Sequence, residues 1–425
     1  MDKRYTVLIQ YQDQTQQPYT ADFQTKAEFA KGWKAVMAKA HAGADITCLC
    51  FGRGAKKLAV RHLAGADGYC LARYPNTGPQ HANDCIYYAP DASKSGLQGY
   101  AEGVVTESDD GGLRVRLGLG LRKKDPLESA AATAQVSTGT STRRPAMTLL
   151  GLLHLLWSEA RLNTWYPRME GKRRLGLVHA KLQETAASIL SSGSRLSDFL
   201  LVAATDRDKA QAAANDAKAA EAHRLDRRLV VIAPLAKHTK GAEDGMGRLP
   251  IYGFAGIPLL TLSKSLWAGA CRSFPAEIAA WKAGGRVIAI AITDTPGAGK
   301  ANVMRLALMA VSERWIPVAS SFEADIEQLL SDECRSYWKP LRFDASEDEV
   351  FPDFWLLDTG ERETPMEVFG RSDPAYLQRK NAKIRHYNRE FGSSGWWAWD
   401  AAADPNGISR PALPERTERT ERTER

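Results

Sequence analysis

The hydrophobic positions along the chain change their spacing several times, and each change predicts a different kind of element. Residues 4–10 are rich in β-formers, residues 26–40 carry apolar side chains at helical spacing, and residues 113–121 again look like a strand. We therefore expect a small α+β module over residues 1–125. Residues 126–146 are rich in Ala, Ser, Thr and Gly without a hydrophobic period, which is typical of a linker.

The pattern becomes helical and then mixed further along the chain. Apolar stripes at helical spacing, the last over residues 196–204, predict a helical region at 147–227, either a plain spacer or a winged-helix-like module. Short β runs alternate with helical stretches over 228–317, which indicates an α/β region. The chain closes in Glu-Arg-Thr repeats, and we expect residues 403–425 to form a disordered tail.

Composition narrows the class of protein. The 425 residues are 44% hydrophobic and 25% charged, which excludes a wholly disordered or fibrous chain. The longest nearly apolar run has about ten residues, half of what a bilayer requires. The first residues show no apolar signal core, so we expect a soluble cytoplasmic protein without a membrane partner. The net charge of +7 concentrates around residues 53–73 and 168–181, which suits a polyanion or marks a solvated surface.

Four soft ligands near the N-terminus form two closely spaced pairs. Cys48 and Cys50 are separated by one residue, and His81 precedes Cys85 by four. Zinc prefers four such ligands in a tetrahedron, and two short chelating pairs supply them at little cost in loop closure. The pattern predicts a structural zinc site; buried reduced cysteines and redox chemistry are the alternatives. Cys70 is expected in the core, though it could replace a ligand.

A glycine-rich segment at residues 295–300 invites comparison with a phosphate-binding loop. Where such a loop needs a glycine this chain has Asp294, and where it needs a hydroxyl side chain it has Ala301. We therefore interpret the segment as a loop between two strands.

Acidic residues are placed near strands in the last hundred residues. Glu323 begins a predicted helix that runs to about residue 337, and residues 351–357 and 364–370 are predicted as two strands of a hairpin. The hairpin would bring Asp353 and Glu367 onto neighbouring strands, where one divalent cation such as Mg²⁺ or Mn²⁺ could bind both carboxylates.

The next predicted helix, residues 374–388, has a polar stripe. Its spacing places on one face Tyr376, Lys380, Lys383 and Tyr387. Lysines facing two metal-binding carboxylates suit phosphodiester hydrolysis, in which they stabilise the developing negative charge. The alternative is a solvated face with two packed tyrosines.

This order of elements resembles the core of the PD-(D/E)XK nuclease superfamily over residues 318–402, with residues 396–399 as the closing strand. The resemblance implies that Asp353 and Glu367 bind metal and that Glu323 assists them. It also implies a lysine two residues after the strand glutamate, but that residue is Phe369. Some members of the superfamily carry the lysine on the following helix, a role that Lys380 or Lys383 would fill here.

The chain as a whole resembles a family of uncharacterised bacterial proteins, the domain-of-unknown-function family numbered 1173, met on plasmids and integrative elements. The resemblance rests on Cys48, Cys50, the segment 77–85 and the segments around Asp353 and Glu367. The resemblance associates the chain with mobile DNA but implies no particular reaction. We therefore expect a metal-dependent nuclease acting on DNA or, alternatively, a non-catalytic nucleic-acid-binding or assembly protein with a degenerate nuclease fold. A weaker third hypothesis is a zinc-organised scaffold for protein partners that binds no nucleic acid.

Overall fold

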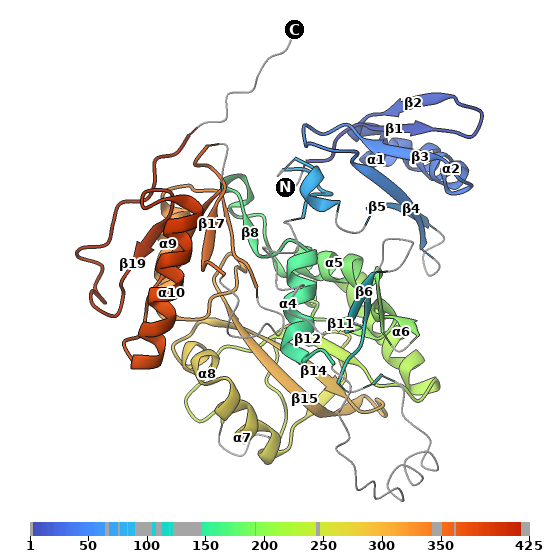
Figure 1. Ribbon diagram of the computed structural model, residues 1–425. Coiled ribbons are helices and arrows are strands. Elements are labelled where there is room, and N and C mark those ends of the chain that lie inside the picture. Colours follow the sequence, from blue (N-terminus) through green and yellow to red (C-terminus); the bar gives the residue numbers. More distant parts are fainter. Residues whose placement is uncertain are drawn as a thin grey trace, which may run out of the picture.

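The computed structural model describes most of the chain, and the mixed α/β architecture is seen in Figure 1. The described residues are 3–63, 68–74, 77–82, 84–89, 104–107, 113–118, 120–121, 146–191, 193–243, 247–341, 351–360 and 363–417. The predicted linker lies outside them, apart from residue 146. No helix in these ranges combines the length and apolar character that a bilayer crossing demands.

The N-terminal part is an antiparallel sheet in the order β2-β1-β3-β4-β5, with two helices packed against it. Its elements are β1 (Val7–Gln10), β2 (Gln16–Tyr19), α1 (Ala21–Thr25), α2 (Ala30–His41), β3 (Asp45–Cys48), β4 (Lys57–Leu63) and β5 (Gly68–Arg73). The short 3₁₀ helices η1 (Ala27–Phe29) and η2 (Gly78–Gln80) complete it. An α+β fold for this part is thus confirmed.

The middle of the chain holds two sheets around one large apolar core. The smaller sheet has the order β10-β9-β7-β6, with β6 (Val105–Glu107), β7 (Leu113–Val115), β9 (Ile189–Ser191) and β10 (Ser194–Arg195). The larger has the order β11-β12-β14-β15-β13, with β11 (Leu200–Val202), β12 (Val230–Pro234), β13 (Leu259–Thr261), β14 (Arg286–Thr293) and β15 (Lys300–Val311). Around them lie α4 (Leu149–Glu159), α5 (Leu175–Ala186), α6 (Lys209–Arg224), α7 (Lys264–Ser273) and α8 (Pro275–Lys282).

The structure corrects the expectation of a helical region at 147–227. Helices α4, α5 and α6 lie there, but so do short strands, and residues 196–204, expected to be helical, form the 3₁₀ helix η6 (Leu196–Asp198) and β11. A short apolar run does not distinguish a buried strand from a buried helix, which explains the error. Strand pairing also crosses two expected boundaries, because β7 pairs with β9 and β11 pairs with β12.

The glycine-rich segment at 295–300 connects β14 to β15, which pair antiparallel along most of their length. The interpretation of this segment as a loop between strands is confirmed.

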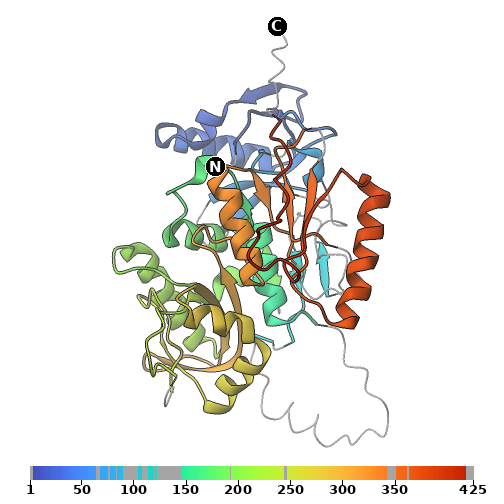
Figure 2. The same cartoon turned by 90° about the vertical axis from the view of Figure 1, so that its left-hand side faces the viewer.

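The C-terminal part is a mixed sheet in the order β19-β18-β17-β16-β8. Its strands are β8 (Thr164–Trp165), β16 (Tyr337–Trp338), β17 (Phe354–Leu356), β18 (Thr364–Val368) and β19 (Trp397–Trp399). Strands β16, β17 and β18 are antiparallel neighbours, whereas β18 and β19 are parallel. In Figure 2 the sheet lies between helices α9 (Ser321–Asp332) and α10 (Pro374–Phe391).

Side-chain caps set where these two helices begin. The Ser320 hydroxyl accepts the Glu323 N–H at 3.1 Å, and the Asp373 carboxylate accepts the Tyr376 N–H at 3.0 Å. Helix α9 is shorter than expected, because it ends at Asp332 and Cys334 then adopts a left-handed backbone with φ 52°. Tyr337 therefore lies in a strand instead of the predicted helix.

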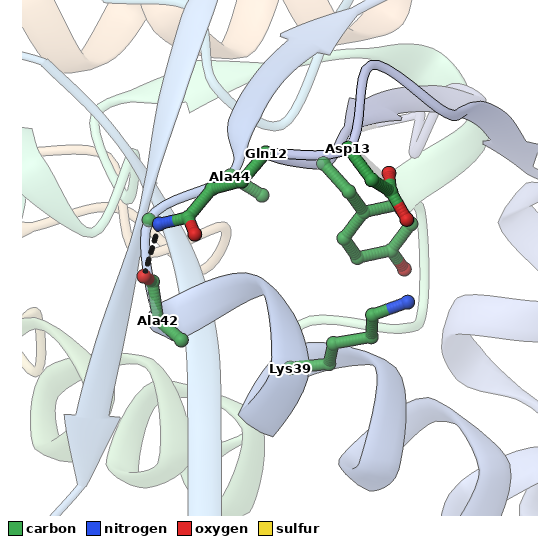
Figure 3. A pocket seen from close by; sticks show the side chains of 7 residues that line it. Gln12, Asp13, Lys39, Ala42 and Ala44 are labelled. Atoms are coloured by element: carbon green, nitrogen blue, oxygen red, sulfur yellow. Dashed lines mark hydrogen bonds between the residues drawn. The ribbon is translucent and has the colours of Figure 1, made fainter.

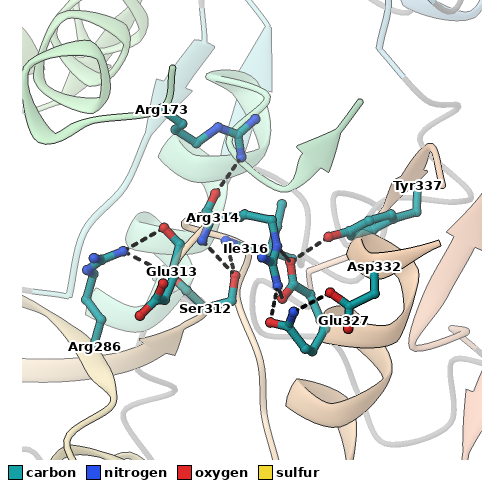
Figure 4. A network of polar contacts seen from close by, with 10 residues as sticks. Arg173, Arg286, Ser312, Glu313, Arg314, Ile316, Glu327, Asp332 and Tyr337 are labelled. Atoms are coloured by element: carbon teal, nitrogen blue, oxygen red, sulfur yellow. Dashed lines mark hydrogen bonds and ion pairs between the residues drawn. The ribbon is translucent and has the colours of Figure 1, made fainter. Parts of the chain in front are cut away.

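A polar network ties the end of β15 to α9 and to the middle of the chain (Figure 4). Arg314 makes two bonds of 2.8 Å to the carboxylate of Glu327, which is 1% exposed and also accepts the Tyr337 hydroxyl. Arg173 donates to the Arg314 carbonyl at 3.1 Å. The C-terminal sheet is thereby held against the preceding α/β region.

Residues 403–417, expected within a disordered tail, instead pack on the C-terminal sheet. The Trp397 indole donates to the carbonyls of Pro411 and Ala412 at 3.2 and 3.1 Å, and Arg335 donates to the Pro414 carbonyl at 2.9 Å. The Glu-Arg-Thr repeats bury little by themselves, but the preceding prolines and alanine offer carbonyls to buried donors. Residues 418–425 lie outside the described part of the chain.

Candidate functional site

The four soft ligands near the N-terminus converge in one buried cluster. The ligand atoms of Cys48, Cys50, His81 and Cys85 all lie within 4.8 Å of one another. The sulfurs of Cys48 and Cys85 are 3.8 Å apart, and His81 Nδ1 lies 3.6 Å from the Cys50 sulfur and 3.7 Å from that of Cys85. Sulfur and nitrogen ligands around a tetrahedral zinc ion would be separated by roughly 3.5–3.8 Å. The buried Cys3His cluster therefore fits a metal ion such as zinc.

The local backbone explains how two separate pairs meet. Cys48 ends β3 next to β1, while His81 directly follows η2. The two segments approach so closely that a Cβ on Gly52 would lie 2.1 Å from the Gln80 carbonyl oxygen. Glycine is thus required where the two segments meet.

The protonation of the cluster suits metal binding. The hydrogen bond between Cys48 and Cys85 lowers the pKa of Cys48 to about 4 and raises the pKa of Cys85 above its usual value. One thiol of the pair is thereby held as thiolate, the form that binds metals. The Ala82 N–H also donates to the Cys50 sulfur at 3.3 Å. Cys70, on β5, lies outside the cluster.

A second cluster combines carboxylates and lysines at the C-terminal sheet. Glu323, 8% exposed, lies in the first turn of α9, Asp353 directly precedes β17, and Glu367, 1% exposed, lies on β18. The Asp353 carboxylate accepts the Val368 N–H at 2.7 Å, and the Asp353 N–H donates to the Met366 carbonyl at 2.8 Å. These bonds fix Asp353 beside the strand that carries Glu367.

Lys383 of α10 reaches the strand glutamate. Its ammonium lies 2.7 and 2.9 Å from the two Glu367 oxygens and donates to the Phe351 carbonyl at 3.1 Å. The Tyr387 hydroxyl also donates to Glu367 at 2.7 Å. Lys380 is placed differently, because it pairs with Asp400 and lies 5.0 Å from the centre of the Phe369 ring. Of the two candidate lysines, the structure brings only Lys383 to the carboxylates.

Lys339 belongs to the cluster and was missed in the sequence. It follows β16, is 6% exposed, and pairs with the Glu323 carboxylate at 2.6 Å. Its ammonium also lies 3.3 Å from the Asp353 carbonyl oxygen. In the sequence it sits in a short basic and aromatic connection without a periodic signal, so only the pairing of β16 with β17 reveals its place.

Burial and mutual repulsion dominate the electrostatics of this cluster. Burial and the neighbouring Asp353 raise the pKa of Glu367 to about 8, although Lys383 and Tyr387 oppose the shift. Burial and the charge of Glu323 likewise raise the pKa of Asp353. Burial and both carboxylates, Asp353 and Glu367, raise the pKa of Tyr376 to about 12. When all three carboxylates are ionised they outnumber the two lysines that contact the cluster in the described part of the chain, and a bound cation could offset the remaining negative charge.

A shallow hollow lies away from both clusters, between the β1–β2 turn and the end of α2. Its volume is about 290 Å³, and its lining includes Tyr11, Gln12 and Lys39. Figure 3 shows Lys39 on its helix, across the hollow from Gln12 and Asp13. The Lys39 ammonium lies 4.1 Å from the centre of the Tyr11 ring. None of the residues predicted from the sequence lines it.

Comparison with known proteins identifies the family and no activity. No curated protein and no solved structure matches the chain. Residues 19–402 match the family described as a protein of unknown function, DUF1173. The match includes the Cys3His cluster and all members of the carboxylate and lysine cluster. The chain therefore belongs to the DUF1173 family.

Proposed function

We propose that the chain is a metal-dependent nuclease acting on DNA, with its reaction centre at the carboxylate and lysine cluster of the C-terminal sheet. The observation that carries the proposal is the convergence of Glu323, Asp353 and Glu367, each from a different element, with Lys339 and Lys383. The order α9-β16-β17-β18-α10-β19 supports it, because it agrees with the helix, strand and helix order that the resemblance to the PD-(D/E)XK core implies. In this proposal the protein is cytoplasmic and serves a plasmid or an integrative element.

The donor set fits a divalent cation. Carboxylate oxygens are the ligands that Mg²⁺ prefers, and Mn²⁺ accepts the same set. Asp353 and Glu367 would hold the ion, with Glu323 beside them. A bound ion supplies an activated water and offsets the charge of the phosphate.

The residues of the chain would position the reactants. Lys383 is held between Glu367 and the Phe351 carbonyl, and its ammonium would stabilise negative charge on the scissile phosphate. Tyr387 fixes the orientation of Glu367, and Lys339 fixes that of Glu323. In this proposal zinc at the Cys3His cluster has a structural role.

Cleavage of labelled single- and double-stranded DNA with Mg²⁺ or Mn²⁺ tests the proposal. We expect metal-dependent cleavage by the wild type and its loss in Asp353→Asn and Glu367→Gln, which keep the shape of the side chains. Lys383→Ala should slow cleavage by about 100-fold or more, the scale on which a preorganised charge-stabilising group acts. Lys380→Ala is the matched control on the same helix and should retain most of the activity, because Lys380 pairs with Asp400.

A non-catalytic function in nucleic-acid binding is the second candidate. The observation that favours it is Phe369 in the position where the nuclease resemblance implies a lysine. In that case the wild type would bind DNA with a steep salt dependence but cleave none with either metal.

A further inference from the structure

The ligand spacing of the Cys3His cluster forces two apolar side chains outward. Cys48 and Cys50 are 0% and 2% exposed, whereas Leu49 is 45% exposed and Phe51 84%. Strand β3 ends at Cys48, and the chain bends at residues 50 and 51. Because both cysteines turn into the cluster, the segment presents Leu49 and Phe51 to solvent. Metal binding would therefore hold an exposed aromatic ring in a fixed place.

Two lysines lie next to residues that flank or contact the exposed ring. The Lys56 ammonium donates to the carbonyls of Cys50 and Gly52, which flank Phe51, at 2.8 and 3.1 Å. The Phe51 and Tyr5 rings pack in a T-shaped arrangement with their centres 5.8 Å apart, and the Lys3 ammonium lies 4.8 Å from the centre of the Tyr5 ring.

The charged residues of the segment that carries Phe51 are all positive. Residues 49–57, which we call the aromatic loop, contain Arg53, Lys56 and Lys57 and no acidic residue. The neighbouring acids are engaged, because Asp84 accepts the Tyr5 hydroxyl at 2.9 Å and Asp45 lies 3.4 Å from the Lys57 ammonium. An exposed ring in a basic segment has the chemistry of a surface that stacks a base and holds its phosphates.

We propose that the aromatic loop binds single-stranded nucleic acid, with a base stacked on Phe51 and the backbone phosphates beside Lys56 and Lys3. A single strand fits better than a duplex, because the faces of duplex bases are already covered by their neighbours. Charge complementarity favours it over an apolar protein partner, for which cations around the ring would have to be desolvated. The surface belongs to the N-terminal sheet, so the proposal does not depend on a nuclease reaction at the C-terminal sheet.

Fluorescence anisotropy of a short labelled oligothymidylate with the full chain, without added divalent cation, tests this proposal. Phe51→Ala should weaken binding by about 5- to 150-fold, the loss expected for one stacked base. Phe51→Trp should retain binding, whereas Phe51→Leu should behave like Phe51→Ala. Ile408→Ala is the matched control, because Ile408 is an equally exposed apolar residue at 88% and lies on the C-terminal segment.

Several results would overturn the proposal. One is unchanged binding by Phe51→Ala at unchanged zinc content; another is equal binding by Phe51→Leu and Phe51→Trp, which would indicate a general apolar contact such as a protein surface. Duplex DNA bound as tightly as the single strand, with the same response to Phe51→Ala, would also contradict it. A failure of the nuclease proposal would leave all these anisotropy results unchanged, so the two are separable.

Discussion

The Cys3His cluster and the carboxylate cluster are both buried groups of candidate metal ligands, but they are held together differently. The cysteine sulfurs and the His81 ring contact one another. Glu323 and Glu367 each pair with a lysine. A cluster of thiols gains its stability from the ion it binds, whereas Glu323 and Glu367 have hydrogen-bonding partners before any ion arrives. The first arrangement suits a permanent ion and the second an exchangeable one.

The largest expected effect comes from removing a ligand of the Cys3His cluster. Cys85→Ala should abolish binding of about one zinc per chain and unfold the N-terminal sheet, because structural zinc contributes roughly 10–16 kcal/mol in small zinc-dependent folds. Elemental analysis and hydrogen exchange measure both effects. Cys70→Ala is the control, since Cys70 lies outside the cluster. Wild-type protein purified without chelators and found free of zinc would contradict the prediction.

A smaller effect is expected when a cation is removed from the carboxylate cluster. Lys339→Met leaves Glu323 buried without its ion-pair partner, which should reduce the free energy of unfolding by about 3–5 kcal/mol. Denaturant titration of the C-terminal sheet, followed through its tryptophans, measures the loss. If adding Mg²⁺ partly restores the stability of Lys339→Met, a divalent cation can replace the missing ammonium in this cluster. If stability is unchanged, the ion pair does not hold this cluster together.

The last effect concerns pH and is the smallest when it is expressed per pH unit. In the folded protein without added metal the pKa of Glu367 is about 8, above the usual value of 4.5, so the folded state binds more protons than the unfolded state between these values. Stability should therefore fall as the pH rises through this window, by up to about 1.4 kcal/mol per pH unit. Thermal unfolding at several pH values measures the slope. Glu367→Gln should reduce it, and an equal slope in this variant would show that Glu367 is not its source.

The two clusters also differ in how far the sequence predicts them. The soft ligands come in two short pairs, so local spacing was sufficient to choose Cys48, Cys50, His81 and Cys85, and the structure places these together. The carboxylate cluster draws on separate elements of a sheet. The hairpin and helix patterns placed Asp353, Glu367 and Lys383 together, but they did not separate Lys383 from Lys380, because both lie on the same polar stripe.

The strands and strand pairings that the sequence did not predict also depend on contacts between distant parts of the chain. Strand pairing is non-local, so nothing near residue 113 in the sequence shows that β7 pairs with β9, and nothing near Lys339 shows that β16 lies next to β17. The short strands of 147–227 were missed because tertiary burial, not local periodicity, determines them. Helices with a clear cap and an apolar face, such as α9 and α10, were found from the sequence.

The packing of residues 403–417 shows that the region matched by the family and the region that packs as one unit end at different residues. The family match ends at residue 402, yet Arg335, only 3% exposed, and the Trp397 indole find acceptors beyond it. A chain shortened to the matched region would leave these donors facing an uncovered edge, with their hydrogen bonds left to solvent. The region that packs as one unit is therefore longer than the region that matches the family. A shortened version of this protein should keep the residues through 417.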